Sequence, residues 1–260
     1  QAPSLSGGFH LLGEIPLDKC SPEKTYTVLR LHYSMDGAEQ VLCPVVLFGA
    51  EDTVLVDCGY PDSLEQLEEA LRACGVEARD LTKLVLTHQD DDHMGAAAAL
   101  KAKYPALQVL ASPEEAPYIE GRKKNLRLQQ AEALQDLLPE ERKTWGERFC
   151  RRLRLLQGVP VDGLIREGDI FDWGGGCRVL ATPGHTPGHL SLVSSHEEFC
   201  VTGDAAVLES NGLSVANPGF CLDLREAERS LRRLQDLPCA RYICYHGGIL
   251  EMQALPLDFP

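Results

Sequence analysis

Residues 87–95 read Thr-His-Gln-Asp-Asp-Asp-His-Met-Gly, and they lie between an apolar segment and a helix-forming run with four consecutive alanines. Two imidazoles and several carboxylates within six residues are costly to bury unless a cation compensates their charge. In an extended turn, residues 88 and 90 project to one side, while residues 92 and 93 at the helix start can face a second point. The stretch therefore predicts a loop that supplies ligands to two neighbouring metals. The alternative is an acidic helix N-terminus that only favours the helix dipole.

Four further segments place a histidine or an aspartate directly after an apolar run or in a turn rich in Gly and Pro. They are Val-Leu-Val-Asp-Cys-Gly (54–59), Thr-Pro-Gly-His-Thr-Pro-Gly-His (182–189), Thr-Gly-Asp (202–204) and Tyr-His-Gly-Gly (245–248). Loops at the ends of scaffold strands are where functional side chains concentrate. The five segments together predict one site assembled from distant parts of the chain.

In this order, from about residue 50 to residue 248, the segments resemble the metal-dependent hydrolases of the metallo-β-lactamase-fold superfamily, in particular its lactonase and glyoxalase II branches. The resemblance implies an α/β fold, a four-layer αβ/βα sandwich, with a binuclear metal site at one edge of the paired sheets. It also implies seven metal ligands: His88, Asp90 and His185 at a first site, Asp92, His93 and His246 at a second, and Asp204 bridging both.

The family pattern H-x-H-x-D-H is altered here, because Asp90 stands at the second histidine position. A carboxylate adds a negative charge and a hard oxygen donor, which suits Fe or Mn better than an all-histidine site, although zinc also accepts carboxylates. We expect two divalent ions, with zinc favoured. The alternative is that Asp90 misses the metal and leaves the first site weak or empty.

Asp57 matches a family position that supports the ligands from behind, and a strand-end turn is its other interpretation. We expect His189, four residues after His185, to support the site rather than to bind metal. His10, His32 and His196 are expected to be structural or surface residues.

The resemblance implies hydrolysis of an activated ester-type bond, with a lactone or thioester favoured, by a hydroxide that bridges the two metals. Asp92 is the expected catalytic residue, because it could accept a proton while remaining a ligand. No Gly-x-Ser-x-Gly nucleophile segment is present in the sequence. Two alternatives stay open: a di-iron redox enzyme related to flavodiiron proteins, and a non-catalytic metal-binding relic of the fold.

Composition narrows the partners and the location. Lys and Arg number 25 against 39 Asp and Glu, a formal net charge of −14. An acidic surface disfavours nucleic-acid binding, and no apolar run approaches the roughly 20 residues that span a membrane. The ten scattered cysteines favour reduced thiols. We therefore expect a cytoplasmic protein that acts on a small molecule.

The elements read as one domain over residues 1–260 with a helical insertion at about 113–157. Strands are expected at 9–12, 25–33, 41–48, 53–57, 83–87, 107–111, 159–165, 177–181, 190–194, 198–202 and 241–245. Helices are expected at 63–74, 94–103 and 224–237, and the insertion should be helical with breaks near Pro139 and Gly146.

The insertion carries an unusual charge. Residues 121–154 hold ten Lys and Arg against five acidic residues, in a chain whose net charge is −14. In this family such insertions commonly cover the active site. We expect the segment to cover the metals and to bind an anionic end of the substrate. A solvated helix face, or a contact in a homo-oligomer, is an equally good interpretation.

Overall fold

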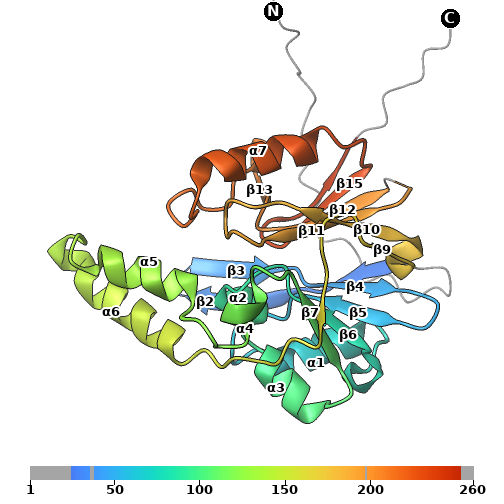
Figure 1. The fold of residues 1–260 in the computed structure, drawn as a ribbon, viewed down its shortest axis with the longest axis horizontal. Helices are drawn as coiled ribbons and strands as arrows, with labels where there is room; N and C mark the ends of the chain where they lie inside the picture. The colour runs from blue at the N-terminus through green and yellow to red at the C-terminus, as the bar shows by residue number, and fades with distance from the viewer. Residues whose placement is uncertain (1–24, 36–37, 197, 253–260) are drawn as a thin grey trace, which may run out of the picture.

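Two six-stranded sheets face each other in the computed structural model, which describes residues 25–35, 38–196 and 198–252 (Figure 1). The first sheet has the order β1 (Tyr26–Val28), β4 (Val45–Phe48), β5 (Thr53–Val56), β6 (Lys83–Val85), β7 (Gln108–Ala111) and β8 (Gly163–Leu164). The second has the order β16 (Gly248–Glu251), β15 (Arg241–Cys244), β12 (Phe199–Gly203), β11 (Leu190–Ser194), β10 (Cys177–Ala181) and β9 (Ile170–Phe171).

Helices cover the outer faces of the paired sheets. Helices α1 (Leu64–Ala73) and α3 (Ala97–Lys103) lie against the first sheet, and α7 (Leu224–Gln235) lies against the second (Figure 1). Two short 3-10 helices, η1 (Ala78–Asp80) and η2 (Trp173–Gly175), and two hairpins, β2 (Leu31–Met35) with β3 (Ala38–Leu42) and β13 (Val207–Glu209) with β14 (Gly212–Ser214), complete this part of the fold.

Three buried clusters separate the layers, and strand alternation explains them. In β5, Val54 and Val56 point into the space between the sheets, whereas Leu55 packs under the helices of the first sheet. A third cluster, which includes Leu234 of α7 and Tyr242 of β15, fills the space above the second sheet. Strands buried on both faces read as continuous apolar runs, as these do. The fold is the expected four-layer αβ/βα sandwich.

The expected strands at 25–33 and 41–48 are each split in two. The chain changes its strand-pairing partner at Leu29 and at Cys43. The N–H of Leu29 bonds to the Pro44 carbonyl (2.8 Å), and the N–H of Cys43 bonds to the Tyr245 carbonyl (2.9 Å), both of which lie outside the strands. Both segments are apolar for most of their length, so their composition does not reveal where the pairing partner changes. The expectation of single strands was wrong.

The insertion consists of α4 (Ala116–Ile119), α5 (Leu126–Gln135) and α6 (Glu140–Arg154), and it lies between β7 and β8. The expected break near Pro139 is present, since Pro139 stands at the N-cap position directly before α6. The break expected near Gly146 is wrong, because α6 runs through it. A Cβ there would lie 2.3 Å from Gln135 Oε1, so the glycine allows α6 to pack closely on α5. Helices α5 and α6, with their connection, are called the cap below.

Several shorter elements differ from the expectation. Residues 159–165 form only the two-residue strand β8, and the short strands β9, β13, β14 and β16 were missed. Residues 94–103 divide between the end of α2 (Asp91–Met94), a turn at Gly95 and Ala96, and α3. Residues 9–12 lie outside the described residues.

Other expectations concern the whole chain. No helix in the described part is long and apolar enough to cross a membrane. The cysteines that the structure describes form no disulfide, in keeping with reduced thiols. The cytoplasmic location stays a prediction.

Gly95 follows α2 and packs against the loop after β5, and we expect its substitution by alanine to destabilise the protein. A Cβ at this position would lie 2.4 Å from the backbone carbon of Tyr60 and 2.5 Å from Pro61 N, and neither can rotate away. Gly95→Ala should lower the free energy of unfolding by about 1–3 kcal/mol, the usual cost of overpacking. Urea unfolding measures this change. Gly219→Ala is the control, because a Cβ there would lie 3.7 Å from its nearest neighbour, Asn217 Oδ1; equal stability of the two variants would contradict the interpretation.

Candidate metal centre

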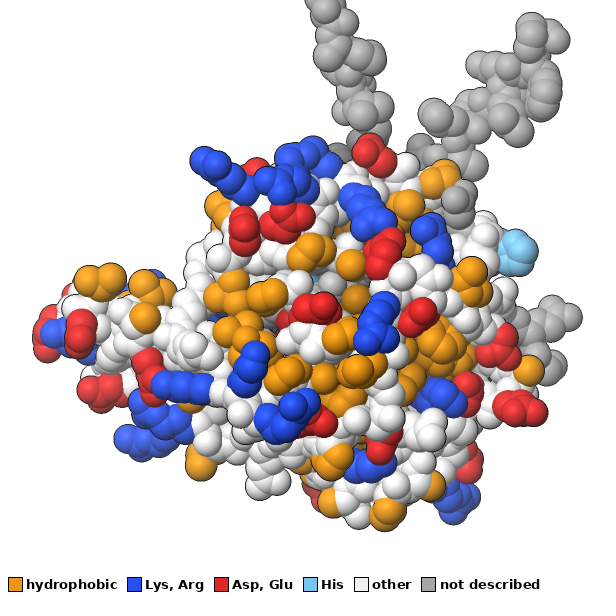
Figure 2. Space-filling view, viewed as in Figure 1, with side chains coloured by type: hydrophobic (Ala, Val, Ile, Leu, Met, Phe, Trp, Pro, Cys, Tyr) orange, Lys and Arg blue, Asp and Glu red, His pale blue; other side chains and the backbone are white. Residues whose placement is uncertain are grey.

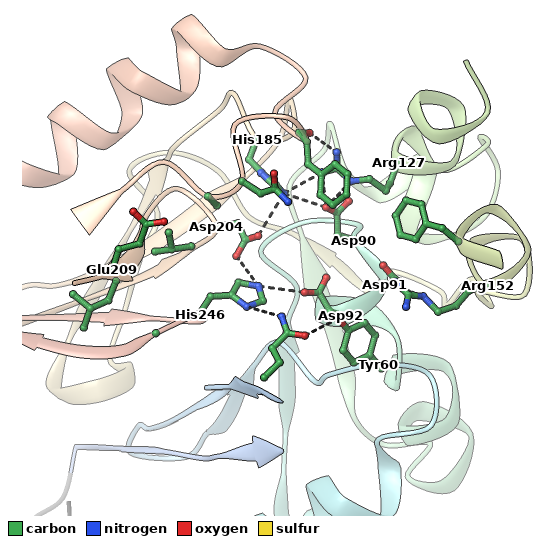
Figure 3. Close-up of a pocket in the computed structure, with 18 residues that line it drawn as sticks. Tyr60, Asp90, Asp91, Asp92, Arg127, Arg152, His185, Asp204, Glu209 and His246 are labelled. Atoms are coloured by element: carbon green, nitrogen blue, oxygen red, sulfur yellow. Dashed lines mark hydrogen bonds and ion pairs between the residues drawn. The ribbon is translucent and has the colours of Figure 1, made fainter. Parts of the chain in front are cut away.

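The carboxyl ends of four strands meet at one edge of the sandwich and carry the seven expected ligands. His88 and Asp90 follow β6, Asp92 and His93 lie in α2 directly after them, and His185, Asp204 and His246 follow β10, β12 and β15. Figure 3 shows five of the seven, Asp90, Asp92, His185, Asp204 and His246. Strands β12 and β15 are parallel, and β10 runs in the same direction because both β10 and β12 are antiparallel to β11. Their carboxyl ends therefore share an edge, and the sandwich brings this edge to the end of β6.

Asp204 lies between two groups of ligand atoms. Its Oδ1 is 3.1 Å from Nε2 of His93 and 3.4 Å from Nε2 of His246, whereas its Oδ2 is 3.4 Å from Nε2 of His185. One carboxylate thus faces both groups with different oxygens. This is the geometry expected of a bridging ligand.

Each group is compact enough to hold one metal ion. The ligand atoms of Asp92, His93 and His246 lie within 4.8 Å of one another, and so do those of His88, His185 and Asp204. Asp90 belongs to the group of His88, His185 and Asp204, since its Oδ2 is 3.6 Å from Nε2 of His88 and 3.1 Å from Nε2 of His185. The same oxygen accepts hydrogen bonds from a guanidinium of the cap, so Asp90 is already paired with a cation.

The donor atoms and the local electrostatics fit metal ions. Nε2 of His88 and Nε2 of His93 are buried and make no hydrogen bond with any described residue, although Asp204 Oδ1 lies near the latter. Burial opposes the charged form of His93, but the carboxylates of Asp204 and Asp57 outweigh it and raise its pKa well above the ordinary value. The carboxylates therefore stabilise positive charge at this position, which divalent cations would supply.

Comparison with known proteins gives the family. The family model of the metallo-beta-lactamase superfamily matches residues 36–246. This chain belongs to that superfamily. It is similar to the probable metallo-hydrolase YflN of Bacillus subtilis (strain 168), at 28% identity over 75% of each chain. It is also similar to the hydroxyacylglutathione hydrolase GloC of Haemophilus influenzae, at 26% identity over 64% of this chain and 67% of that one.

Among solved structures, a metallo-beta-lactamase family protein from Thermus thermophilus superimposes with a TM-score of 0.66, at 24% identity, over 87% of this chain and 75% of that one. This likeness confirms the fold. The family and the named relatives support the classification of this superfamily member as a metal-dependent hydrolase.

Asp57 orients two histidines of the superfamily site from behind. Its Oδ2 accepts from Nδ1 of His93 (2.8 Å) and from the Thr87 hydroxyl (2.8 Å), and its Oδ1 accepts from Thr87 N (2.9 Å). The Thr87 hydroxyl also lies 3.0 Å from Nδ1 of His88. Asp57 has φ 60°, a left-handed conformation that is rare for a residue with a side chain. The strand end is thus shaped to present this carboxylate.

His189 supports Asp204. Its Nε2 accepts from the backbone N–H of Asp204 at 2.9 Å, and its Nδ1 lies 2.8 Å from the Thr182 hydroxyl. The ring fits because position 203 is glycine, where a Cβ would lie 2.6 Å from Nε2 of His189. This is the supporting role expected from the sequence. His32 and His196 are exposed, and His10 lies outside the described residues.

Two residues whose roles were not expected from the sequence, Glu115 and Arg127, connect the loops of the site. Glu115 is fully buried; its Oε2 accepts from the backbone and side-chain N–H groups of Gln89 (3.1 Å each), and its Oε1 accepts from Gly188 N (2.8 Å). Burial raises the pKa of Glu115 to about 6. Glu115 thus ties the loop of His88 to the loop of His185. A single Glu within a helical insertion carries no sequence signal for this role.

A cleft of about 400 Å³ opens over the site. One wall carries Arg127, Phe149 and Arg152 of the cap, and the opposite wall carries the β13 strand (Val207–Glu209) (Figure 3). The cap therefore lines the cleft as expected. Of the ten basic residues in 121–154, however, only these two arginines line it. The others include Arg122, Lys124 and Arg154, which pair with acids of the insertion, and charges of both signs are interspersed over the cap (Figure 2).

We expect Asp57→Asn to weaken metal binding, because the Asn amide oxygen cannot accept the three hydrogen bonds that the carboxylate accepts. Loss of such a supporting group typically lowers metal affinity by roughly 10- to 100-fold. Competition with a chromophoric zinc chelator measures the affinity. The control is Asp62→Asn at an exposed position, and unchanged affinity in a folded Asp57→Asn variant would contradict the assigned role.

Proposed function

We propose that this protein is a binuclear metal-dependent hydrolase that cleaves a lactone or a thioester. The observation that carries the proposal is the placement of Asp204, whose two oxygens face two separate groups of histidine and carboxylate ligands. The first metal would be held by His88, His185 and Asp204 with Asp90 beside it, and the second by Asp92, His93, His246 and Asp204.

Two divalent ions in these positions would acidify a water molecule towards neutral pKa and polarise the scissile carbonyl. Zinc fits the donor set best, since four of the ligands are imidazoles. Fe and Mn remain alternatives through the carboxylate of Asp90. The di-iron redox interpretation depends on Asp90 as a strong ligand, and the guanidinium paired with its Oδ2 weakens that interpretation.

Asp92 is the proposed proton acceptor. Its side chain lines the cleft with 16% exposure, while Oδ2 lies 3.2 Å from Nε2 of His246 and its backbone carbonyl accepts from the Tyr245 hydroxyl at 2.6 Å. The carboxylate is thus fixed at the floor of the cleft. It can take the proton of the attacking water and return it to the leaving group.

The cleft favours a small substrate with an anionic group. The Arg152 guanidinium lies between the rings of Tyr60 (5.3 Å) and Phe149 (5.2 Å) and pairs with Asp91 (2.8 Å) at the cleft wall. A carboxylate of the substrate could join this cation from the open side. The thioester choice is supported by the similarity to the protein named hydroxyacylglutathione hydrolase.

We expect protein purified without chelator and reconstituted with zinc to hold two metals per chain and to hydrolyse thioesters or lactones. In Asp92→Asn, kcat should fall by roughly 10²–10⁴ while the fold is retained, because the amide cannot accept the proton. Elemental analysis and steady-state kinetics measure the two quantities. Asp80→Asn, at an exposed position, is the control. Two bound zinc ions without hydrolysis of either substrate class would favour the non-catalytic alternative.

We expect Arg152→Gln to raise KM for acyl substrates that carry a carboxylate, and to leave KM for neutral esters unchanged. Because the side chain is 35% exposed, the effect should reach at most about fivefold. Added salt should reduce the difference between wild type and variant. Lys143→Gln, on the same helix and outside the cleft, is the control; an equal rise in KM for neutral and anionic substrates would contradict anion recognition.

A further inference from the structure

Arg127, the second residue of α5, reaches from the cap into the metal centre. Its guanidinium donates to Asp90 Oδ2 from Nη2 (2.6 Å) and from Nε (3.1 Å). Nη2 also lies 3.1 Å from Nε2 of His185. One cation therefore contacts two of the atoms that would hold the first metal, Asp90 Oδ2 and His185 Nε2 (Figure 3).

The guanidinium is anchored on its other side. Nη1 donates to the Phe220 carbonyl and to Gln130 Oε1, and the Phe220 ring lies 4.9 Å from the guanidinium carbon. The residue is 3% exposed. Hydrogen bonds on both sides fix this planar cation in one orientation, so Arg127 is a built part of the site rather than a mobile surface side chain.

The backbone next to Arg127 is also attached to the ligand loop. Leu126 N donates to the side-chain oxygen of Gln89 (2.7 Å), and the Asn125 amide donates to the Gln89 carbonyl (2.9 Å). The start of helix α5 is thus hydrogen-bonded to Gln89, the residue between His88 and Asp90. The start of the cap cannot shift without moving this loop.

The ligand atoms of the other group are arranged differently. Nε2 of His93 lies 3.1 Å from Oδ1 of Asp204, and Oδ2 of Asp92 faces Nε2 of His246 at 3.2 Å, so these ligand atoms contact one another. An ion that enters there meets donor atoms which face one another. An ion that enters the first group finds Nε2 of His88 without a hydrogen bond to any described residue. Its other two contacts, Asp90 Oδ2 and His185 Nε2, are already engaged by Arg127, which also brings a like charge within a few ångströms.

We propose that Arg127 is a built-in competitor for the first metal, so that the two metal positions fill in sequence. The group of Asp92, His93 and His246 fills first and tightly, and the group of His88 and His185 fills second and more weakly. This inference rests on the proposed metal centre. Arg127 is thereby a positioning residue, because it acts on the metal through Asp90 and His185.

The test is a zinc titration of the metal-free full chain in chelator-buffered solutions, with the bound metal counted by elemental analysis. Wild type should bind one zinc tightly and a second more weakly. Arg127→Met should tighten the second binding step by roughly 10- to 100-fold, the size expected when charge-assisted hydrogen bonds no longer compete. The first step should not change.

Thermal unfolding supplies a second measurement. Arg127→Met leaves the buried Asp90 carboxylate without its cation, so the melting temperature should fall in the metal-free protein and recover when two zinc ions are bound. If this variant does not fold, Asp90→His with Arg127→Met replaces it, since a neutral imidazole needs no cation there. Its second step should likewise be tighter than that of wild type. Arg154→Met, a cap residue paired with Glu132, is the control and should behave as wild type.

Three outcomes would overturn the inference. Equal affinity of wild type for both zinc ions would show that nothing distinguishes the two positions. An Arg127→Met variant, or the double variant, whose second step is unchanged or weaker would show that Arg127 does not compete, while leaving the binuclear centre in place. A wild-type protein that never binds two zinc ions would overturn this inference and the proposed function together.

Discussion

The position of one carboxylate, Asp204, determines how the two halves of the site combine. Its oxygens face two groups of ligand atoms, one built around His93 and His246 and one around His185. This arrangement requires the ends of β6 and β12, which belong to different sheets, to stay close together. The buried cluster between the sheets therefore does more than stabilise the fold, because it sets the spacing between the two proposed metals.

A layer of supporting hydrogen bonds holds the imidazoles and the bridge in place. Asp57 acts on His93 directly and on His88 through Thr87, and His189 holds the backbone of Asp204. Each contact leaves the ring nitrogen or carboxylate oxygen that faces the centre available for a metal. The polar groups are buried but satisfied on their outer sides, which keeps their orientation fixed.

The cap is joined to the metal centre by polar contacts. Gln89 accepts a hydrogen bond from the first residue of α5, and Arg127 pairs with Asp90. Glu115 connects the loops of His88 and His185. The basic residues of the insertion fall into two sets. Most of them are exposed to solvent outside the cleft, whereas Arg127 and Arg152 reach the cleft. Charge counting alone does not separate these two sets.

The sequence by itself determined the family, the layered fold and the identity of the ligand-bearing loops. Residues 87–95 are informative because histidines and aspartates rarely crowd a strand end without a ligand, and local spacing already divides them between two points. Apolar runs such as Val54–Val56 mark strands covered on both faces, since no side of them can meet water. The resemblance to the family implied the supporting role of Asp57, and the position of His189 four residues after His185 favoured the same role for that residue.

Only the tertiary structure decided the contacts between residues far apart in the chain. Nothing local marks Arg127 as the partner of Asp90, 37 residues earlier, or Glu115 as the acceptor for Gln89, 26 residues earlier. The split of residues 25–33 and 41–48 into separate strands has the same cause, since pairing partners change where composition does not. The spacing of apolar residues in a helix indicates which face is buried. The group that a long side chain such as Arg127 contacts depends on how the cap packs against the sandwich.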